Sequence, residues 1–191
     1  MNRDIQLIVI GGSAGSLQVI FKIFKYIPAG FSVPFLIVLH RNVNFESALD
    51  ELLAVKSKLK VKEVEEKDKI EPGYIYLCPP DYHVLIEKNH TFALDYSEKI
   101  HHSRPSIDVV FKSTSATFKD HVLGILLSGA NADGGDGLKM IQENGGLTIV
   151  QDPNESEVSY MPHHALQKLK ADHVLESNDI GKFIFNHYAH A

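Results

Sequence analysis

Short runs of apolar residues alternate along this chain with segments whose apolar residues recur at helical spacing. The apolar runs cover 5–10, 34–39, 74–78, 121–127 and 147–150, and helical patterns include 16–27 and 107–118. Strands that are apolar along their whole length are buried on both faces of a sheet. Their alternation with helices predicts an α/β fold: a doubly wound, mostly parallel sheet with helices on both faces.

The remaining segments complete this expected architecture. Alternating runs at 84–86 and 91–94 predict an antiparallel hairpin at one edge of the sheet, and a charged strand is expected near 61–64. Further helices are expected at 46–58, 138–143, 162–168 and 180–187. No internal repeat, low-complexity segment or linker interrupts the pattern, so we expect one domain over residues 1–191.

Composition excludes several classes of protein. The net charge of −5 and the lack of a long basic stretch argue against a nucleic-acid partner. No apolar run reaches the roughly 20 residues of a membrane-spanning helix, so no membrane insertion is expected. The first residues lead directly into a strand without a signal peptide, and Cys78 is the single cysteine. These features predict a cytoplasmic protein without disulfides.

Polar residues follow three of the predicted strands, at the edge where α/β sheets place their sites. Ser13 lies in a glycine-rich turn after the first strand, His40 ends the second, and Asp133 follows the strand that ends at Leu127. Together they supply a nucleophile, a base and a carboxylate that orients the base. Each alone has a simpler interpretation, since a serine or aspartate here can cap a helix and a histidine can be structural.

The residue types in these loops allow two other interpretations. Asn131, Asp133 and Asp136 resemble oxygen ligands of a cation, but the later glutamate of a calcium loop is missing, so no metal is predicted. The glycine-rich turn at 11–16 does not fit the dinucleotide-binding pattern, and His40 stands where an acidic residue would be needed. We therefore expect no cofactor.

The order and spacing of several motifs resemble the catalytic domain of CheB-type protein-glutamate methylesterases over nearly the whole chain. The motifs are IGGSAG (10–15), LH (39–40), CPPDYH (78–83), SRPSID (103–108), LSGANADG (127–134), QDP (151–153) and MP (161–162). The resemblance implies a doubly wound α/β domain and a triad of nucleophile Ser13, general base His40 and orienting Asp133.

The resemblance also implies a substrate and a mechanism. The substrates would be glutamate γ-methyl esters of methyl-accepting chemotaxis receptors, with glutamine deamidation as a second activity of the same acyl-enzyme. Backbone N–H groups near Ala14 and Ala130 are expected to bind the oxyanion, a role worth about 3 kcal/mol per donor in other hydrolases. Arg104, next to the predicted start of a helix, is expected either to contact substrate at the mouth of the site, or to be solvated at the surface or contact the helix end.

The chain departs from the family pattern in two places. Ala14 replaces a hydroxyl residue after the nucleophile, and Ser16 replaces the second of two glycines. The first change removes a side-chain contact to the histidine, so a catalytically weak module that docks a receptor or partner is the alternative function. Well-known members of the family also carry a receiver domain before the catalytic domain. Because this chain starts at the catalytic domain, we expect either constitutive activity or control by a separate regulatory protein.

Overall fold

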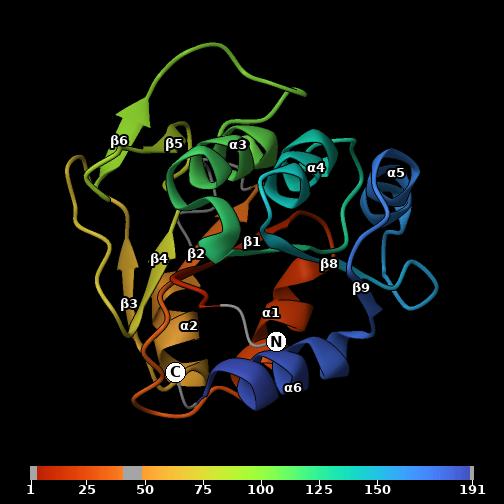
Figure 1. Cartoon of the computed structure of the whole chain (residues 1–191), viewed down its shortest axis with the longest axis horizontal. Coiled ribbons are helices and arrows are strands. Elements are labelled where there is room, and N and C mark those ends of the chain that lie inside the picture. Colours follow the sequence, from red (N-terminus) through yellow and green to blue (C-terminus); the bar gives the residue numbers. More distant parts are fainter. Residues whose placement is uncertain (1–3, 41–48, 190–191) are drawn as a thin grey trace.

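The computed structural model describes residues 4–40 and 49–189, and its core is a parallel sheet of seven strands. The strand order is β3-β4-β2-β1-β7-β8-β9 (Figure 1). These strands are β1 (Leu7–Gly12), β2 (Phe35–Leu39), β3 (Lys60–Glu63), β4 (Tyr74–Leu77), β7 (Val122–Leu126), β8 (Leu147–Gln151) and β9 (His173–Leu175). All neighbouring pairs are parallel, which confirms the predicted fold class.

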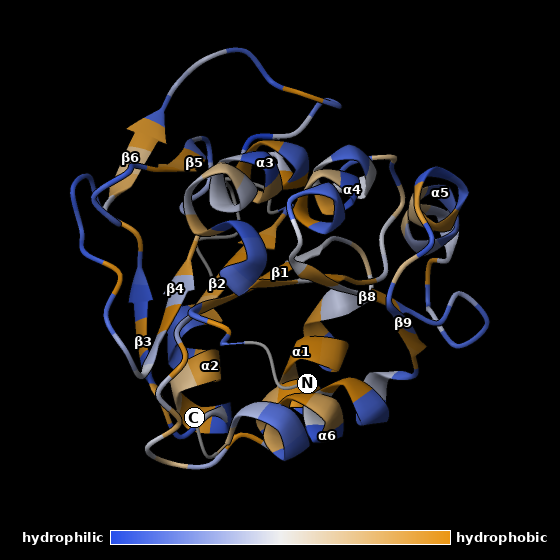
Figure 2. Cartoon of the chain, in the orientation of Figure 1, coloured by the Kyte–Doolittle hydropathy of each residue, from blue (hydrophilic) through white to orange (hydrophobic). Residues whose placement is uncertain are grey.

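Helices cover both faces of the sheet. The first layer is α1 (Ser16–Phe24), α2 (Leu49–Lys56) and α6 (Ser177–Tyr188), whose apolar residues share one core cluster. The second layer is α3 (Ile107–Phe118), α4 (Gly135–Glu143) and α5 (Tyr160–Lys168), which share the other. Figure 2 shows the apolar stripes of these helices and the apolar central strands. A short 3-10 turn, Lys119–His121, joins α3 to β7.

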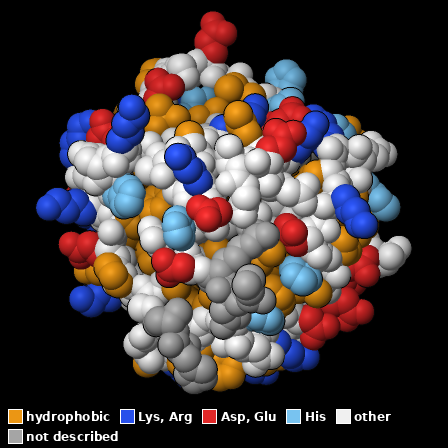
Figure 3. Space-filling model, in the orientation of Figure 1, with side chains coloured by type: hydrophobic (Ala, Val, Ile, Leu, Met, Phe, Trp, Pro, Cys, Tyr) orange, Lys and Arg blue, Asp and Glu red, His pale blue; other side chains and the backbone are white. Residues whose placement is uncertain are grey.

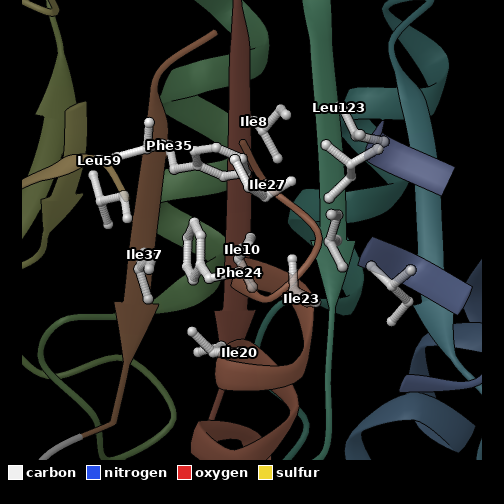
Figure 4. Close-up of a cluster of buried hydrophobic side chains, with 14 of the residues drawn as sticks. Ile8, Ile10, Ile20, Ile23, Phe24, Ile27, Phe35, Ile37, Leu59 and Leu123 are labelled. Atoms are coloured by element: carbon white, nitrogen blue, oxygen red, sulfur yellow. The ribbon is translucent and has the colours of Figure 1, made fainter. Parts of the chain in front are cut away.

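Alternate residues of the central strands enter the two core clusters. Ile8 and Ile10 of β1 pack with α1 (Figure 4), whereas Leu7 and Val9 belong to the cluster on the α3 side. This alternation follows from the pleat, which turns successive side chains to opposite faces. The same alternation determines the face of the sheet toward which the side chains just after each strand point, and these side chains include the candidate site residues.

The structure differs from the sequence prediction in some details. The hairpin β5 (His83–Ile86) and β6 (Phe92–Asp95) is antiparallel as expected, but it forms a two-stranded sheet of its own instead of joining an edge of the main sheet. Strand β9 was not predicted, because its three residues carry no apolar run. The first residues of the helix expected at 46–58 lie outside the described residues, and the described helix is Leu49–Lys56.

Two surface properties bear on partners. No helix within residues 4–40 and 49–189 is long and apolar enough to cross a membrane. On the face drawn in Figure 3, basic and acidic side chains of the described residues lie interspersed.

Candidate active site

The carboxyl ends of β1 and β2 bring Ser13 and His40 side by side. The two strands are paired in parallel up to Gly12 and Leu39, so the next residues are Ser13 and His40. The His40 N–H donates to the Gly12 carbonyl at 3.3 Å, which extends the pairing by one bond. Neighbouring strands lie about 4.8 Å apart. Alternation along the strands directs both side chains toward the α3 side of the sheet.

His40 contacts Asp133 through a short hydrogen bond. Its Nε2 lies 2.9 Å from Asp133 Oδ2, and the imidazole is 11% exposed whereas the aspartate side chain is fully buried. A carboxylate can only accept here, so Nε2 carries the proton and Nδ1 is the acceptor nitrogen of the neutral ring. The structure therefore brings two of the three predicted triad residues into direct contact.

Asp133 sits against the N-terminus of α3, where it accepts four hydrogen bonds. Besides His40, the donors are the N–H of Ile107 at 2.6 Å, the N–H of Asp108 at 2.9 Å and the Ser106 hydroxyl at 2.9 Å. Burial by itself would raise the pKa of Asp133, but the hydrogen bonds from His40 and from these N–H groups hold it below its ordinary value. The helix dipole favours the same charge. Asp133 is thus a buried, ionised acceptor for His40.

A second histidine fixes the start of α3. The buried His83 accepts the N–H of Ser106 on Nδ1 at 3.1 Å, while its Nε2 lies 3.0 Å from the Glu98 carbonyl. Both ring nitrogens are thus engaged with backbone groups. Ser106 is the N-cap of α3, and its hydroxyl donates to Asp133. His83 therefore acts on Asp133 through Ser106, and its contacts do not suit a second base.

The turn after β1 leaves the Ser13 side chain uncommitted. The N-cap of α1 is Gly15, at a φ of 79°, so Ser13 is not the helix cap. The Ser13 N–H donates to the Ser128 carbonyl at 2.9 Å, whereas its hydroxyl forms no hydrogen bond with any described residue. Ser13 and His40 are adjacent in register without a hydrogen bond between their side chains. A free enzyme can have such loose geometry before substrate binds.

Two exposed residues beside Ser13 offer free backbone donors. Among the described residues, the N–H groups of Ala14 and Ala130 find no backbone or side-chain acceptor. Ala14 directly follows Ser13, the position whose N–H serves the oxyanion in the nucleophile turns of other hydrolases. Ala130 lies in the loop after β7, next to Gly129, where an added Cβ would lie 3.1 Å from the Ser13 Cβ. Both predicted oxyanion donors are therefore available.

Asn131 contacts the other nitrogen of His40. Its Nδ2 lies 3.4 Å from His40 Nδ1, and its Oδ1 accepts the N–H of Asp133 at 3.2 Å. The second contact orients the amide so that its NH₂ faces the imidazole. The sequence pattern suggests Asn131 only as a cation ligand. It instead supplies a side-chain contact to the histidine, the type of contact that Ala14 cannot make.

Arg104 is engaged away from the triad. Its Nη2 lies 2.8 Å from Asp81 Oδ1, its Nη1 donates to the carbonyls of Tyr96 and Ser97, and its guanidinium stacks on the Tyr96 ring at 3.8 Å. The hydrogen bond from Arg104 lowers the pKa of the Asp81 carboxyl. Because its donors are engaged in this way, we interpret Arg104 as a residue that fixes the loop between β6 and α3, and not as a substrate contact.

One group of possible metal ligands occurs among the described residues. His101, Asp108 and Asp133 place their ligand atoms within 4.8 Å of one another. The oxygens of Asp133 already accept four hydrogen bonds, however, and Asp108 Oδ1 accepts the N–H of Gly137 at 2.6 Å. Because these acceptors are engaged, we assign no metal to the group.

The supporting residues were harder to find in the sequence than the triad. Ser106 could be identified as an N-cap, because a serine followed by a helical pattern is typical of one. Nothing local indicates that its hydroxyl reaches Asp133, which lies 27 residues away along the chain. Ser128 and Ser16, which bond to the backbone around Ser13, likewise have no sequence signal for that contact.

Comparison with known proteins identifies relatives. The CheB methylesterase family profile matches residues 8–184. A Leptospira interrogans protein provisionally named protein-glutamate methylesterase/protein-glutamine glutaminase is 41% identical, over 93% of this chain and 92% of its own. A Methanospirillum hungatei protein with that name and the suffix 2 is 37% identical, over 85% of this chain and 46% of its own. The crystal structure of the Thermotoga maritima CheB methylesterase catalytic domain matches with a TM-score of 0.90 and 29% identity, over 95% of this chain and 98% of that domain.

Proposed function

The chain belongs to the CheB methylesterase family, and from this premise we propose that it hydrolyses glutamate γ-methyl esters of methyl-accepting chemotaxis receptors. Ser13 is the nucleophile, His40 the general base, and Asp133 the carboxylate that orients and stabilises the imidazole. The observation that carries this proposal is the contact of His40 Nε2 with the buried, ionised Asp133, which leaves Nδ1 as the acceptor nitrogen of the neutral imidazole.

Acylation follows from these positions. The Ser13 hydroxyl first replaces the Asn131 amide as the donor to His40 Nδ1. As the Ser13 oxygen attacks the ester carbonyl, its proton moves to this nitrogen, and the resulting imidazolium is stabilised by Asp133 across the 2.9 Å contact. The carbonyl π bond opens to a tetrahedral oxyanion, which accepts hydrogen bonds from the N–H groups of Ala14 and Ala130. Its collapse breaks the bond to the methoxy group, which takes the proton from His40 and leaves as methanol.

Deacylation repeats the sequence with water. His40 removes a proton from water, which attacks the acyl-Ser13 ester, and the second tetrahedral intermediate releases free glutamate and restores the Ser13 hydroxyl. A glutamine side chain entering the same site would release ammonia in place of methanol and give the same acyl-enzyme. Deamidation is therefore a second reaction of the same groups.

The alternative, a docking module with a weak active site, is less well supported. A module of this kind has no need to keep the Asp133 charge buried, yet three hydrogen bonds from α3 hold this charge besides His40. These contacts favour a working esterase.

Methanol release from a methylated chemoreceptor tests the proposal. The wild-type chain should release methanol catalytically, and Ser13→Ala should abolish turnover. Since the Ser13 hydroxyl forms no hydrogen bond with any described residue, the free energy of unfolding of the variant should lie within about 0.5 kcal/mol of the wild-type value. A folded Ser13→Ala variant that still releases methanol at the wild-type rate would rule out Ser13 as nucleophile.

A further inference from the structure

Two buried serine hydroxyls fix the two carbonyls that flank the Ala14 residue. The Ser16 hydroxyl donates to the Ser13 carbonyl at 2.6 Å, and the Ser128 hydroxyl donates to the Ala14 carbonyl at 2.7 Å. Both serines are fully buried. In a trans peptide the C=O and the following N–H point in opposite directions. Fixing the Ser13 carbonyl therefore fixes the direction of the Ala14 N–H.

The Ser16 contact is not a helix cap. A capping serine accepts from a backbone N–H of the first turn, and it stands at the N-cap. Ser16 is instead the first residue of α1, the N-cap is Gly15, and the Ser16 hydroxyl donates backward to a carbonyl outside the helix. The Ser16 N–H donates to the same Ser13 carbonyl at 3.1 Å. The carbonyl of the nucleophile residue is thus held by two donors.

Ser128 holds the next peptide and the nucleophile itself. Its hydroxyl donates to Ala14, its own carbonyl accepts the Ser13 N–H at 2.9 Å, and its hydroxyl accepts the Val158 N–H at 2.9 Å. The Ser128 N–H donates to Gln151 at 2.9 Å, so the serine is tied to β8 as well. Ser128 therefore connects the turn after β1 to the rigid sheet.

Glycines make the space for both hydroxyls. A Cβ at Gly12 would lie 2.7 Å from the Ser16 oxygen, and a Cβ at Gly15 would lie 2.9 Å from the Ser128 oxygen. Each hydroxyl thus occupies the place that a side chain on the neighbouring glycine would take. The glycine-rich turn and the two serines form one packed unit.

We propose that Ser16 and Ser128 are positioning residues that aim the Ala14 N–H at the oxyanion of the esterase reaction. This inference rests on the proposed function and adds to it the groups that orient the oxyanion donor. Ser16, one of the two departures from the family pattern, thereby acquires a role. Its hydroxyl is needed in the transition state, where the Ala14 N–H bonds to the developing charge, and not for binding the neutral ester.

Steady-state kinetics of methanol release, combined with inhibition by a small arylboronic acid, tests this assignment. Boronic acids form a tetrahedral adduct on the nucleophile that requires the same donor. Ser16→Ala and Ser128→Ala should each lower kcat by about 10- to 100-fold with KM nearly unchanged, because the N–H is misaimed and not removed. The boronate inhibition constant should rise by a similar factor.

The control is Ser115→Ala. The Ser115 hydroxyl is also buried and donates to a carbonyl, that of Met140 at 3.0 Å, but between α3 and α4. The Ser115→Ala variant should therefore keep the wild-type kcat and the wild-type affinity for the boronic acid. Ser16→Gly removes the same hydroxyl and replaces Ser16→Ala if that variant does not fold.

The possible outcomes separate the inference from the proposed function. Folded Ser16 and Ser128 variants with wild-type kcat and boronate affinity would overturn the inference alone. A fall in kcat with unchanged boronate affinity, or equal losses in Ser115→Ala, would also overturn it, because these results indicate general loosening. A wild-type chain that binds boronate on Ser13 but releases no methanol would instead reject the methylesterase substrate.

Discussion

At the scale of single residues, the pKa values of two neighbouring buried carboxyl groups, Asp133 and Asp108, are shifted in opposite directions. Hydrogen bonds from His40 and the α3 backbone outweigh burial and lower the pKa of Asp133. Burial, with a smaller contribution from the charge of Asp133, raises the pKa of Asp108. Two neighbouring carboxyls with opposite pKa shifts are typical of sites that use one of them as an anion.

The opposite shifts predict opposite effects of amide substitution on stability. The lowered pKa of Asp133 means that its stabilising contribution is present above its ordinary value of 3.8 and is lost as pH falls through the folded pKa. The raised pKa of Asp108 means that stability falls as pH rises from 3.8 through its folded pKa. Near neutral pH, Asp133→Asn should lower the free energy of unfolding by about 3 kcal/mol, whereas Asp108→Asn should leave it unchanged or raise it.

Urea unfolding of both variants between acidic and neutral pH checks this prediction. Asp108→Asn keeps an oxygen that can accept the Gly137 N–H, so the two substitutions differ mainly in the charge they remove. The account is contradicted if both variants lose the same stability near neutral pH.

At the scale of elements, continuous apolar runs and the helical patterns between them were enough to predict most of the fold. The bounds of α3 match the predicted 107–118, because Ser106 caps a clear amphipathic pattern. Strand β1 extends to Gly12, two residues beyond the predicted apolar run. The prediction ended the strand too early because glycines usually indicate a turn, whereas here the strand continues through them. The hairpin was placed wrongly at an edge of the sheet because pairing between distant segments is not encoded in local alternation.

The packing of α3 on β1 connects this layer to the site. A Cβ at Gly11 would lie 2.3 Å from the Ile107 side chain, in the first turn of α3. Gly11→Ala should therefore push the α3 N-terminus away from the sheet, destabilise the fold by about 1–3 kcal/mol and lower kcat through the hydrogen bonds of Asp133.

A double-mutant cycle tests the origin of this effect. Ile107→Ala should itself cost stability, but in the Gly11→Ala background it removes the clash with Ile107 and leaves only the tight approach to the Phe111 ring. The double variant should therefore be more stable than the sum of the single costs predicts. Additive losses, measured by thermal and urea unfolding, would show that the clash does not determine the position of α3.

At the scale of the whole molecule, the sheet topology gathers distant residues into one site. Parallel strands order their carboxyl ends at a single edge, which is why Ser13, His40 and Asp133 could be predicted together from the sequence. The hydrogen bonds that α3 donates to Asp133 and the contacts of Arg104 could not be predicted from the sequence, because they depend on how distant loops meet in the folded chain. The chain belongs to the CheB methylesterase family, and the role of each site residue is a proposal to be tested.

The most direct measurement of the central claim is covalent labelling by a fluorophosphonate, with fragment-ion sequencing of the tryptic peptide 4–22 to distinguish Ser13 from Ser16. The Ser13 oxygen displaces fluoride from phosphorus while His40 takes its proton, so the wild-type chain should carry one adduct, on Ser13. His40→Gln should react at least about 100-fold more slowly. An adduct on another residue, or labelling of His40→Gln at the wild-type rate, would contradict the account.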